Sequence, residues 1–251
     1  MIKNSFSVML ILDNIAYSLD NNTLSSSLFD GIQGHVKKID CPLSPELTNV
    51  VGSCNGLFCM YSEVKEQCCL WNPCTTEVRF LPRSGFQGIR KKTRCSLGKG
   101  HGFGYDFKSD DYKYVRIFCN GSRSSPDSQS QVQIYSFRTN MWKEMYVPYI
   151  LTNVDRNENA PNGVSCNGAL HWFARKNSSP KVLLVFDMIG VGVREIPEPE
   201  NMDVKNLGNS KYVDVLDGKS LHSSQWWFSR FPCMGNEGLR NERIVDNDAQ
   251  H

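Results

Sequence analysis

Short apolar runs separated by turn-forming residues cover most of the chain, and their spacing predicts β-strands. In YKYVRIFC, residues 112–119, one face carries aromatic residues and an arginine, and the other carries mainly valine, isoleucine and cysteine. Both faces are therefore partly apolar, as expected for a strand in a sheet that is covered on both sides. Apolar residues spaced by three and four positions, which would indicate helices, are scarce. The pattern predicts an all-β fold.

The apolar runs also recur as a repeat of two halves. The first half is a turn followed by an apolar strand, SCNGLFCMYS, and it reappears as VSCNGALHWFAR. The second half carries an aromatic residue that recurs at Tyr17, Trp71, Tyr135 and Phe186, in steps of 54, 64 and 51 residues. A repeat of about 50 to 60 residues with several short strands is typical of a propeller blade with loop insertions. We therefore predict a β-propeller-like (kelch-like) array of antiparallel blades.

The turns within the repeat have identifiable causes. Asn-Gly tolerates positive φ, so each CNG segment predicts a tight reversal into the next strand. Pro73 fixes φ and lacks an N–H, so the chain should turn in the segment WNPCTT rather than extend a ladder. Val78, Phe80 and Pro82 then alternate with Glu77, Arg79 and Leu81, which predicts a strand with one face more buried than the other.

Composition and charge exclude several classes of protein. The chain has 251 residues and a net charge of +2, which is no electrostatic signature of nucleic-acid or anionic-membrane binding. No apolar run approaches the roughly 20 residues of a membrane span. No secretory signal is evident, because Asp13 interrupts the apolar patch near the start and no cleavage site follows. We therefore expect a cytoplasmic or nuclear protein whose thiols stay reduced.

Five of the ten cysteines lie within residues 50–82, which raises the question of a metal site. Their spacing fits zinc knuckles only in a stretched form, because structural zinc sites usually present Cys-x(2–4)-Cys pairs. Their neighbours, as in GLFCMYS and QCCLW, are apolar and aromatic. Since a free cysteine behaves as a small buried hydrophobic residue, we favour cysteines that fill strand interiors over a metal site, and we expect no cofactor.

The ordered motifs resemble a known family. VVGSCNGLFCM, LWNPCTTEVRFLP, GFGYDFKSDDYKYVRI, VQIYSFRTNMWKEM and NGALHWFAR follow one another in this order. Together they resemble the F-box-associated domain of plant F-box proteins, the S-locus and immune-regulating types included, over residues 7–197. The resemblance implies a substrate-recognition module of an SCF-type ubiquitin ligase receptor. Such a module selects target proteins for ubiquitination and does no chemistry itself.

Two departures from the family pattern shape the domain prediction. The family's F-box, which docks on the Skp adaptor, lies upstream of the matched segment, where only six residues precede Ser7. We therefore expect the F-box to be missing and Skp to be a partner only if an upstream F-box exists. The resemblance also fades after YVDVLDGKSL. We predict one domain over residues 1–221, a propeller incomplete at its C-terminal end, and a divergent tail over residues 222–251 for which disorder is one interpretation.

The candidate partner-binding residues are basic and lie in one long loop. They are Arg90, Lys91, Lys92 and Arg94, with Lys99 close by. A solvated loop explains them as well, but loops held by rigid scaffolds concentrate binding residues, which makes an acidic protein the expected partner. Trp226 and Trp227 are either an exposed anchor for a partner or part of a strand.

The sequence indicates no catalytic set. The glycine run LGKGHGFGYDF lacks the Gly-Lys-Ser/Thr ending and the helix of a phosphate-binding loop, and glycines that permit close strand packing explain it better. We expect His171 to be a hydrogen-bonded core histidine, and Asp110 and Asp111 to be solvated turn residues. The alternatives left open are an enzyme on a propeller scaffold, a decoy that binds substrate without delivering it, and a nonfunctional truncated remnant.

Overall fold

The regular elements of the structure, a computed structural model, are strands throughout the residues it describes. These are residues 7–12, 15–20, 36–43, 48–85, 99–120, 129–152, 162–176, 179–197, 211–216, 219–224 and 227–231. Within these ranges the structure contains no helix with the length and apolarity that a membrane crossing requires. The all-β prediction is confirmed.

Within these ranges the strands form five antiparallel blades, which we number in chain order. Blade 1 contains β1 (Ser7–Leu12), β2 (Ile15–Asp20) and β3 (Val36–Ile39). Blade 2 contains β4 (Thr48–Cys54), β5 (Leu57–Ser62), β6 (Gln67–Trp71) and β7 (Val78–Phe80). Blade 3 contains β8 (Lys99–Asp106), β9 (Asp111–Asn120), β10 (Gln129–Ser136) and β11 (Met141–Val147). Blade 4 contains β12 (Ile150–Leu151), β13 (Asn162–Cys166), β14 (Ala169–Arg175), β15 (Lys181–Asp187) and β16 (Gly192–Pro197). Blade 5 contains β17 (Lys211–Leu216), β18 (Lys219–Ser224) and β19 (Trp227–Phe231).

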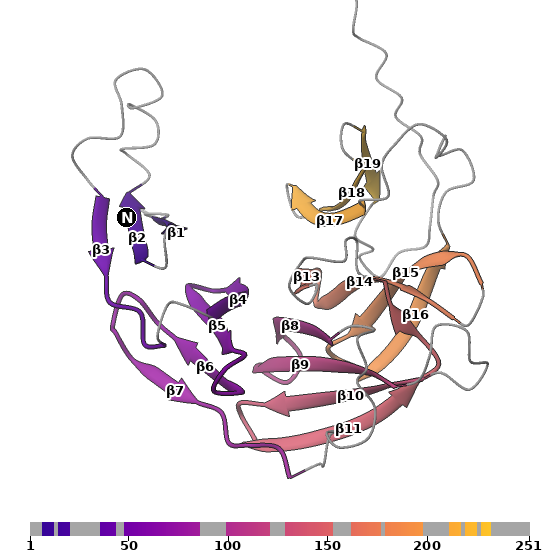
Figure 1. Cartoon of the computed structure of the whole chain (residues 1–251), viewed down its shortest axis with the longest axis horizontal. Coiled ribbons are helices and arrows are strands. Elements are labelled where there is room, and N and C mark those ends of the chain that lie inside the picture. Colours follow the sequence, from indigo (N-terminus) through magenta and orange to yellow (C-terminus); the bar gives the residue numbers. More distant parts are fainter. Residues whose placement is uncertain are drawn as a thin grey trace, which may run out of the picture.

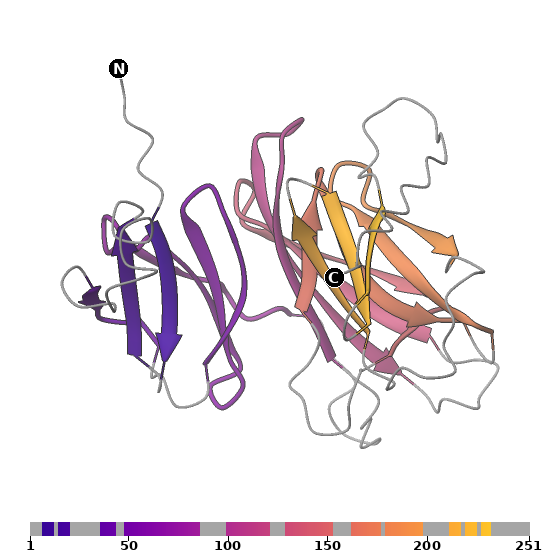
Figure 2. The ribbon, with the colours of Figure 1, turned by 90° about the horizontal axis from the view of Figure 1, so that it is seen from above.

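The blades follow one another around an arc, as in a propeller that is open on one side (Figure 1). Seen from above, blades 1 and 2 stand beside the larger group formed by blades 3 to 5 (Figure 2). Blades 3 and 4 are continuous, because their innermost strands β8 and β13 pair in parallel through Asn162↔His101 and Gly163↔Gly102. The arrangement confirms the predicted propeller-like array.

The turns form as the sequence predicts. Asn55 and Gly56 have φ of 52° and 76°, and Asn167 and Gly168 have φ of 48° and 72°. These pairs close two-residue hairpins between β4 and β5 and between β13 and β14, where two successive positive φ values match the twist of the strands. The turn after β6 is held by the Asn72 side chain, whose Oδ1 accepts hydrogen bonds from the amides of Cys74 and Thr75.

The repeated aromatic residues occupy the same place in successive blades. Trp71, Tyr135 and Phe186 lie on the third strand counted from the inner strand β4, β8 or β13 of their blades, and all three are buried. Tyr17 lies on the middle strand of blade 1. The repeat found in the sequence is therefore a structural repeat in blades 2 to 4, each of which buries one large ring at the same place.

Among the described residues, three apolar cores join blades 1 to 4, and each lies between two neighbours. Leu43, Met60, Cys69 and Trp71 join blade 2 to the chain that follows blade 1. Blades 2 and 3 share a core whose members are Val51, Cys59, Tyr61, Cys68, Leu81, Phe103, Tyr114, Tyr135 and Phe137. Blades 3 and 4 share a larger core that includes Val115, Ile117, Trp172 and Phe186. The two faces predicted for residues 112–119 are thus confirmed, since each faces a different core.

The strand predicted for residues 77–82 forms as β7, but the expectation that one of its faces is more buried is wrong. Val78 and Phe80 are 37% and 47% exposed, and Pro82 is exposed as well. The buried residue is Leu81, beyond the end of the strand, where its N–H donates to the carbonyl of Cys68. β7 is the outermost strand of blade 2, and an outer strand is covered on neither face as fully as an inner one.

Glycines form the seam between blades 3 and 4. A Cβ on Gly163 would lie 2.3 Å from two ring carbons of Trp172, and one on Gly102 would lie 2.8 Å from the same ring. Trp172 is 1% exposed, so the indole lies directly over the parallel β8–β13 pair. The glycine run therefore serves close packing, as predicted.

The cysteines mostly fill strand interiors. Cys59, Cys68 and Cys69 are buried free thiols, and burial raises the pKa of Cys69 to about 12. Cys74 is exposed in a turn. Cys166 is disulfide-bonded, so the expectation that the thiols stay reduced is wrong for this residue.

Candidate functional site

The blades have two ends, which we name by their connections. The turn end carries the tight hairpins Asn55–Gly56 and Asn167–Gly168 and the four-residue turn between β8 and β9. A hydrogen bond from Asn55 Nδ2 to the hydroxyl of Tyr112, 3.1 Å long, places the hairpins of blades 2 and 3 at the same end. The loop end is the opposite end, where β7 leads towards β8 and where β9 leads into β10.

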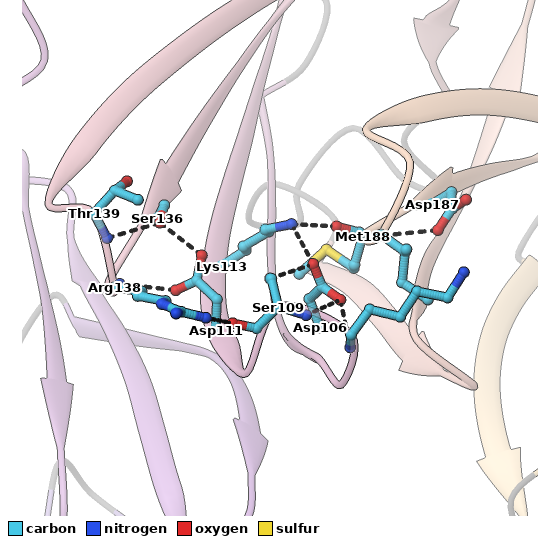
Figure 3. Close-up of polar contacts among 11 residues, drawn as sticks. Asp106, Ser109, Asp111, Lys113, Ser136, Arg138, Thr139, Asp187 and Met188 are labelled. Atoms are coloured by element: carbon cyan, nitrogen blue, oxygen red, sulfur yellow. Dashed lines mark hydrogen bonds and ion pairs between the residues drawn. The ribbon is translucent and has the colours of Figure 1, made fainter.

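A buried ion pair ties the turn ends of blades 3 and 4 together (Figure 3). Lys113 Nζ lies 2.7 Å from Asp106 Oδ2, with side-chain exposures of 10% and 2%. The same ammonium donates to the backbone carbonyl of Met188, in the turn of blade 4. Because the lysine has a carboxylate and a carbonyl as partners, its charge is compensated in a site with little water.

The Asp106 carboxylate is stabilised in its charged form. Burial alone would raise its pKa, but hydrogen bonds from Lys113, from the Ser109 hydroxyl and from the amides of Ser109 and Lys108 outweigh burial. The pKa of Asp106 is lowered from 3.8 to about 2. The residue therefore acts as a fixed structural anion, and not as a proton donor near neutral pH.

A second carboxylate at the turn end corrects a sequence prediction. Asp110 is exposed and accepts a hydrogen bond from the Tyr105 hydroxyl, 2.5 Å long. Asp111, which we expected to be solvated, is 4% exposed. It accepts hydrogen bonds from the Ser136 hydroxyl and the Arg138 amide, 2.6 and 2.8 Å long (Figure 3). Asp111 thus fixes the turn between β10 and β11, a role that only the pairing of β9 with β10 creates.

A second polar cluster, which we name the loop-end cluster, lies near the loop end on the face of blade 3 that meets blade 2. Its members are His101, Arg116, Gln131 and Gln133. Arg116 Nε donates to Gln133 Oε1 at 2.7 Å, and its guanidinium also donates to the Ser84 hydroxyl. The guanidinium carbon lies 4.7 Å from the centre of the Trp142 ring and 5.1 Å from that of Phe118. Hydrogen bonds and aromatic faces therefore fix the orientation of Arg116.

His101 lies in the same row of side chains as Arg116, since the two residues are cross-strand partners. Its Nδ1 is 2.7 Å from the Tyr114 hydroxyl, and its ring lies 4.4 Å from that of Tyr61. Burial and, after it, the charges of Arg116 and Lys99 lower the pKa of His101 to about 3. The imidazole is therefore neutral at physiological pH.

The predicted partner-binding residues Arg90, Lys91, Lys92 and Arg94 lie outside the described residues. The described residues on either side of their loop both lie near the loop-end cluster: Ser84 contacts Arg116 and Gln133, and Lys99 begins β8 next to Phe118. His171 is buried, as predicted, with Nδ1 3.1 Å from the Val164 carbonyl oxygen, and burial lowers its pKa. Sequence reasoning did not select Arg116, Gln131 or Gln133, although their alternation with apolar residues placed them on the faces of strands.

The polar groups described at both ends serve the structure of the blades. Within the described ranges, no three histidine, cysteine or acidic side chains gather as a metal site would require. The polar groups described above serve hydrogen bonds and ion pairs that hold the blades and their turns. Antiparallel blades around an arc, with apolar cores between them and fixed polar ends, define a propeller-type domain.

Comparison with known proteins identifies the family. The model of the F-box associated beta propeller domain matches residues 6–205, and the chain belongs to this family. F-box/kelch-repeat protein At3g23880 of Arabidopsis thaliana is 28% identical over 175 residues, which cover 69% of this chain and 45% of the relative. Putative F-box protein At1g33530 of the same plant is 30% identical over 218 residues, which cover 77% of this chain and 44% of the relative. The chain thus spans less than half the length of these relatives.

Proposed function

We propose that the chain is the substrate-recognition module of an SCF-type ubiquitin ligase receptor. In this role it binds a target protein and presents it for ubiquitination, while other subunits carry out the chemistry. The observation that carries the proposal is the family match over residues 6–205, together with relatives that are themselves F-box proteins.

The physical organisation supports binding by the ends of the blades. The inter-blade cores and the hydrogen bond from Lys113 to the Met188 carbonyl hold neighbouring blades in fixed relative positions. Loops that project from such a scaffold can vary in sequence without loss of the fold, which is why binding residues concentrate there. The long connection between β7 and β8 carries the basic residues predicted to contact a partner: Arg90, Lys91, Lys92 and Arg94.

The expected partners of the chain are proteins. The target is a protein, and the charge of the β7–β8 connection favours an acidic surface on it. Contact with the Skp adaptor requires an F-box, which the relatives' names imply for those proteins. We propose the cytoplasm or nucleus as the place of action and assign no cofactor, metal or nucleic acid to the chain.

The proposal is tested by joining the chain to an F-box and expressing the fusion in plant cells. Proteins captured by the chain are identified first, and their abundance is then measured with and without a proteasome inhibitor. We expect the abundance of a captured protein to fall and the inhibitor to restore it. A matched fusion with Arg90, Lys91, Lys92 and Arg94 changed to glutamate should have a weaker effect.

Each alternative predicts a different result. A captured protein that keeps its abundance with the fusion would contradict delivery, whereas one that becomes more abundant when the chain is expressed without an F-box would support a decoy. An enzyme on the propeller scaffold would convert a substrate in the purified chain, and no described residue set favours it. A remnant would show a protease-sensitive chain with no cooperative unfolding.

A further inference from the structure

Two hairpins at the turn end contain the same tetrapeptide. Residues 53–56 in blade 2 and residues 165–168 in blade 4 both read Ser-Cys-Asn-Gly. Both close two-residue turns with positive φ at the asparagine and at the glycine. Because the local chemistry is identical, a difference in reactivity between the two hairpins must come from the structure around them.

An Asn-Gly pair can react with itself. The main-chain nitrogen of the glycine attacks Cγ of the asparagine, the Cγ–Nδ2 bond breaks, and ammonia leaves with the proton of the glycine N–H. Water then opens the cyclic imide at either carbonyl, which gives aspartate or isoaspartate. Glycine favours ring closure because it has no Cβ to obstruct its nitrogen. A tight turn opposes closure by holding both residues at positive φ, so the rate follows local opening of the hairpin.

The hairpin at Asn55 is weakly held. Asn55 and Gly56 are both exposed, and nothing lies within 4 Å of a Cβ added to Gly56. In the described part of blade 2, β4 is the terminal strand of its sheet, and its ladder with β5 is irregular between Val50 and Gly52. The hydrogen bond from Asn55 Nδ2 to the Tyr112 hydroxyl, 3.1 Å long, is exposed to solvent. This hairpin can therefore open without the loss of buried contacts.

The hairpin at Asn167 is held by the neighbouring turns. The Gly168 carbonyl accepts a hydrogen bond from the Met188 amide, 3.1 Å long. Gly168 is also covered, because a Cβ added to it would lie 3.4 Å from Phe107 Cε1 and 3.8 Å from Ile189 Cδ1. Opening of this hairpin would break the hydrogen bond and separate these side chains from the glycine.

A covalent bond also distinguishes the two hairpins. Cys54, directly before Asn55, is a free thiol, whereas Cys166, directly before Asn167, is disulfide-bonded. A cross-link reduces the conformational freedom of the chain next to it. The hairpin at Asn167 should therefore open less often than the hairpin at Asn55.

We propose that Asn55 is a site of spontaneous deamidation and isoaspartate formation, and that the fold protects the same tetrapeptide at Asn167. The product at Asn55 carries a negative charge, and it can no longer donate a hydrogen bond to the Tyr112 hydroxyl. Isoaspartate also adds one carbon atom to the main chain of the hairpin. The modification therefore changes the turn end of blade 2 as the protein ages, requires no enzyme and is independent of the proposed function.

The test incubates the whole chain in neutral, non-reducing buffer and measures deamidation at each asparagine by peptide mapping with mass spectrometry. Isoaspartate is detected by methyl transfer from S-adenosylmethionine with an isoaspartyl methyltransferase. We expect deamidation at Asn55 to be at least about fivefold faster than at Asn167, the ratio that one additional hydrogen bond would give. Equal rates, or a faster reaction at Asn167, would overturn the proposal. An Asn55 that stays unmodified while a peptide of residues 50–60 is converted would also overturn it.

The unfolded chain is the first control. In urea with a reducing agent, the two asparagines should react at rates within about twofold of each other, because only the fold separates them. A fivefold difference that persists in the unfolded chain would contradict protection by the structure. Reduction of the folded chain should raise the rate at Asn167 and leave the rate at Asn55 unchanged.

Two variants test the cover over Gly168. Phe107→Ala removes an exposed ring, so it should raise the deamidation rate at Asn167 at least about threefold and leave Asn55 unchanged. Val64→Ala is the matched control at another exposed apolar residue of a turn, since Phe107 and Val64 are 61% and 68% exposed, and it should change either rate by no more than about twofold. A rate at Asn167 that responds neither to Phe107→Ala nor to reduction would overturn the assigned protection.

Discussion

Replacement of Gly163 by alanine tests the seam between blades 3 and 4. The added methyl group would lie 2.3 Å from Cε2 and Cζ2 of Trp172 and 2.9 Å from its Nε1. Ordinary contacts of this kind are about 3.5 to 4.0 Å, so the indole or the strand must move by more than an ångström. Trp172 is 1% exposed in the core shared by the two blades, which leaves little room for such a shift.

Overpacking of this kind costs about 1–3 kcal/mol, and we expect Gly163→Ala to fall in the upper part of that range. Gly192→Ala is the matched control, because nothing lies within 4 Å of its added Cβ. That variant should be neutral or more stable by up to about 1 kcal/mol, since alanine restricts the unfolded chain. Both substitutions add one methyl group to a glycine. A loss of stability in Gly163→Ala without a loss in Gly192→Ala would therefore come from the contact with Trp172.

The assay is urea unfolding followed by tryptophan fluorescence, with the midpoint and slope compared among variants. Trp172→Phe in the Gly163→Ala background should recover part of the loss, so the double variant should be more stable than the sum of the single changes predicts. Equal midpoints for Gly163→Ala and the wild-type chain would refute the close approach of Gly163 and Trp172.

Three further predictions concern charge and sulfur. The pKa of Asp106 lies at about 2, below its ordinary 3.8, so the carboxylate contributes stability that is present above 3.8 and lost as pH falls through about 2. Asp106→Asn should remove about 2 kcal/mol of this acid-dependent stability, and acid titrations that fall equally steeply in both proteins would contradict it. Cys74, which is exposed, should react with N-ethylmaleimide well before the buried Cys69, because the raised pKa of Cys69 leaves almost no thiolate. Equal reaction rates of the two thiols in the folded chain would contradict the burial of Cys69 in the core between blades 1 and 2. Reversal of the charges at Arg90, Lys91, Lys92 and Arg94 should slow association with an acidic partner and reduce the dependence of the association rate on salt. Unchanged association rates across a salt series would contradict a role of this loop in binding.

The sequence revealed the repeat because local rules create it. Asn-Gly pairs close hairpins wherever they occur between strands, and Trp71, Tyr135 and Phe186 are buried on equivalent strands. The fold class and these turns could therefore be predicted from alternation and turn chemistry alone.

What the sequence could not show depends on which strands become neighbours. The exposure of Val78 and Phe80 follows from the outer position of β7, and the burial of Asp111 follows from the approach of Ser136 and Arg138. The loop-end cluster is of the same kind, because Gln131 and Gln133 acquire their meaning only when Arg116 and Glu144 lie opposite them. No local pattern in those segments showed which residues of neighbouring strands lie opposite one another.

We propose that this chain selects a protein for ubiquitination, and a reconstituted ubiquitination reaction tests this proposal most directly. The chain, joined to an F-box, would be combined with the Skp adaptor, the remaining ligase subunits and a purified captured protein. The account predicts ubiquitin chains on the captured protein that disappear when the chain is replaced by the F-box alone. A captured protein that remains bound to the complex but unmodified would contradict it.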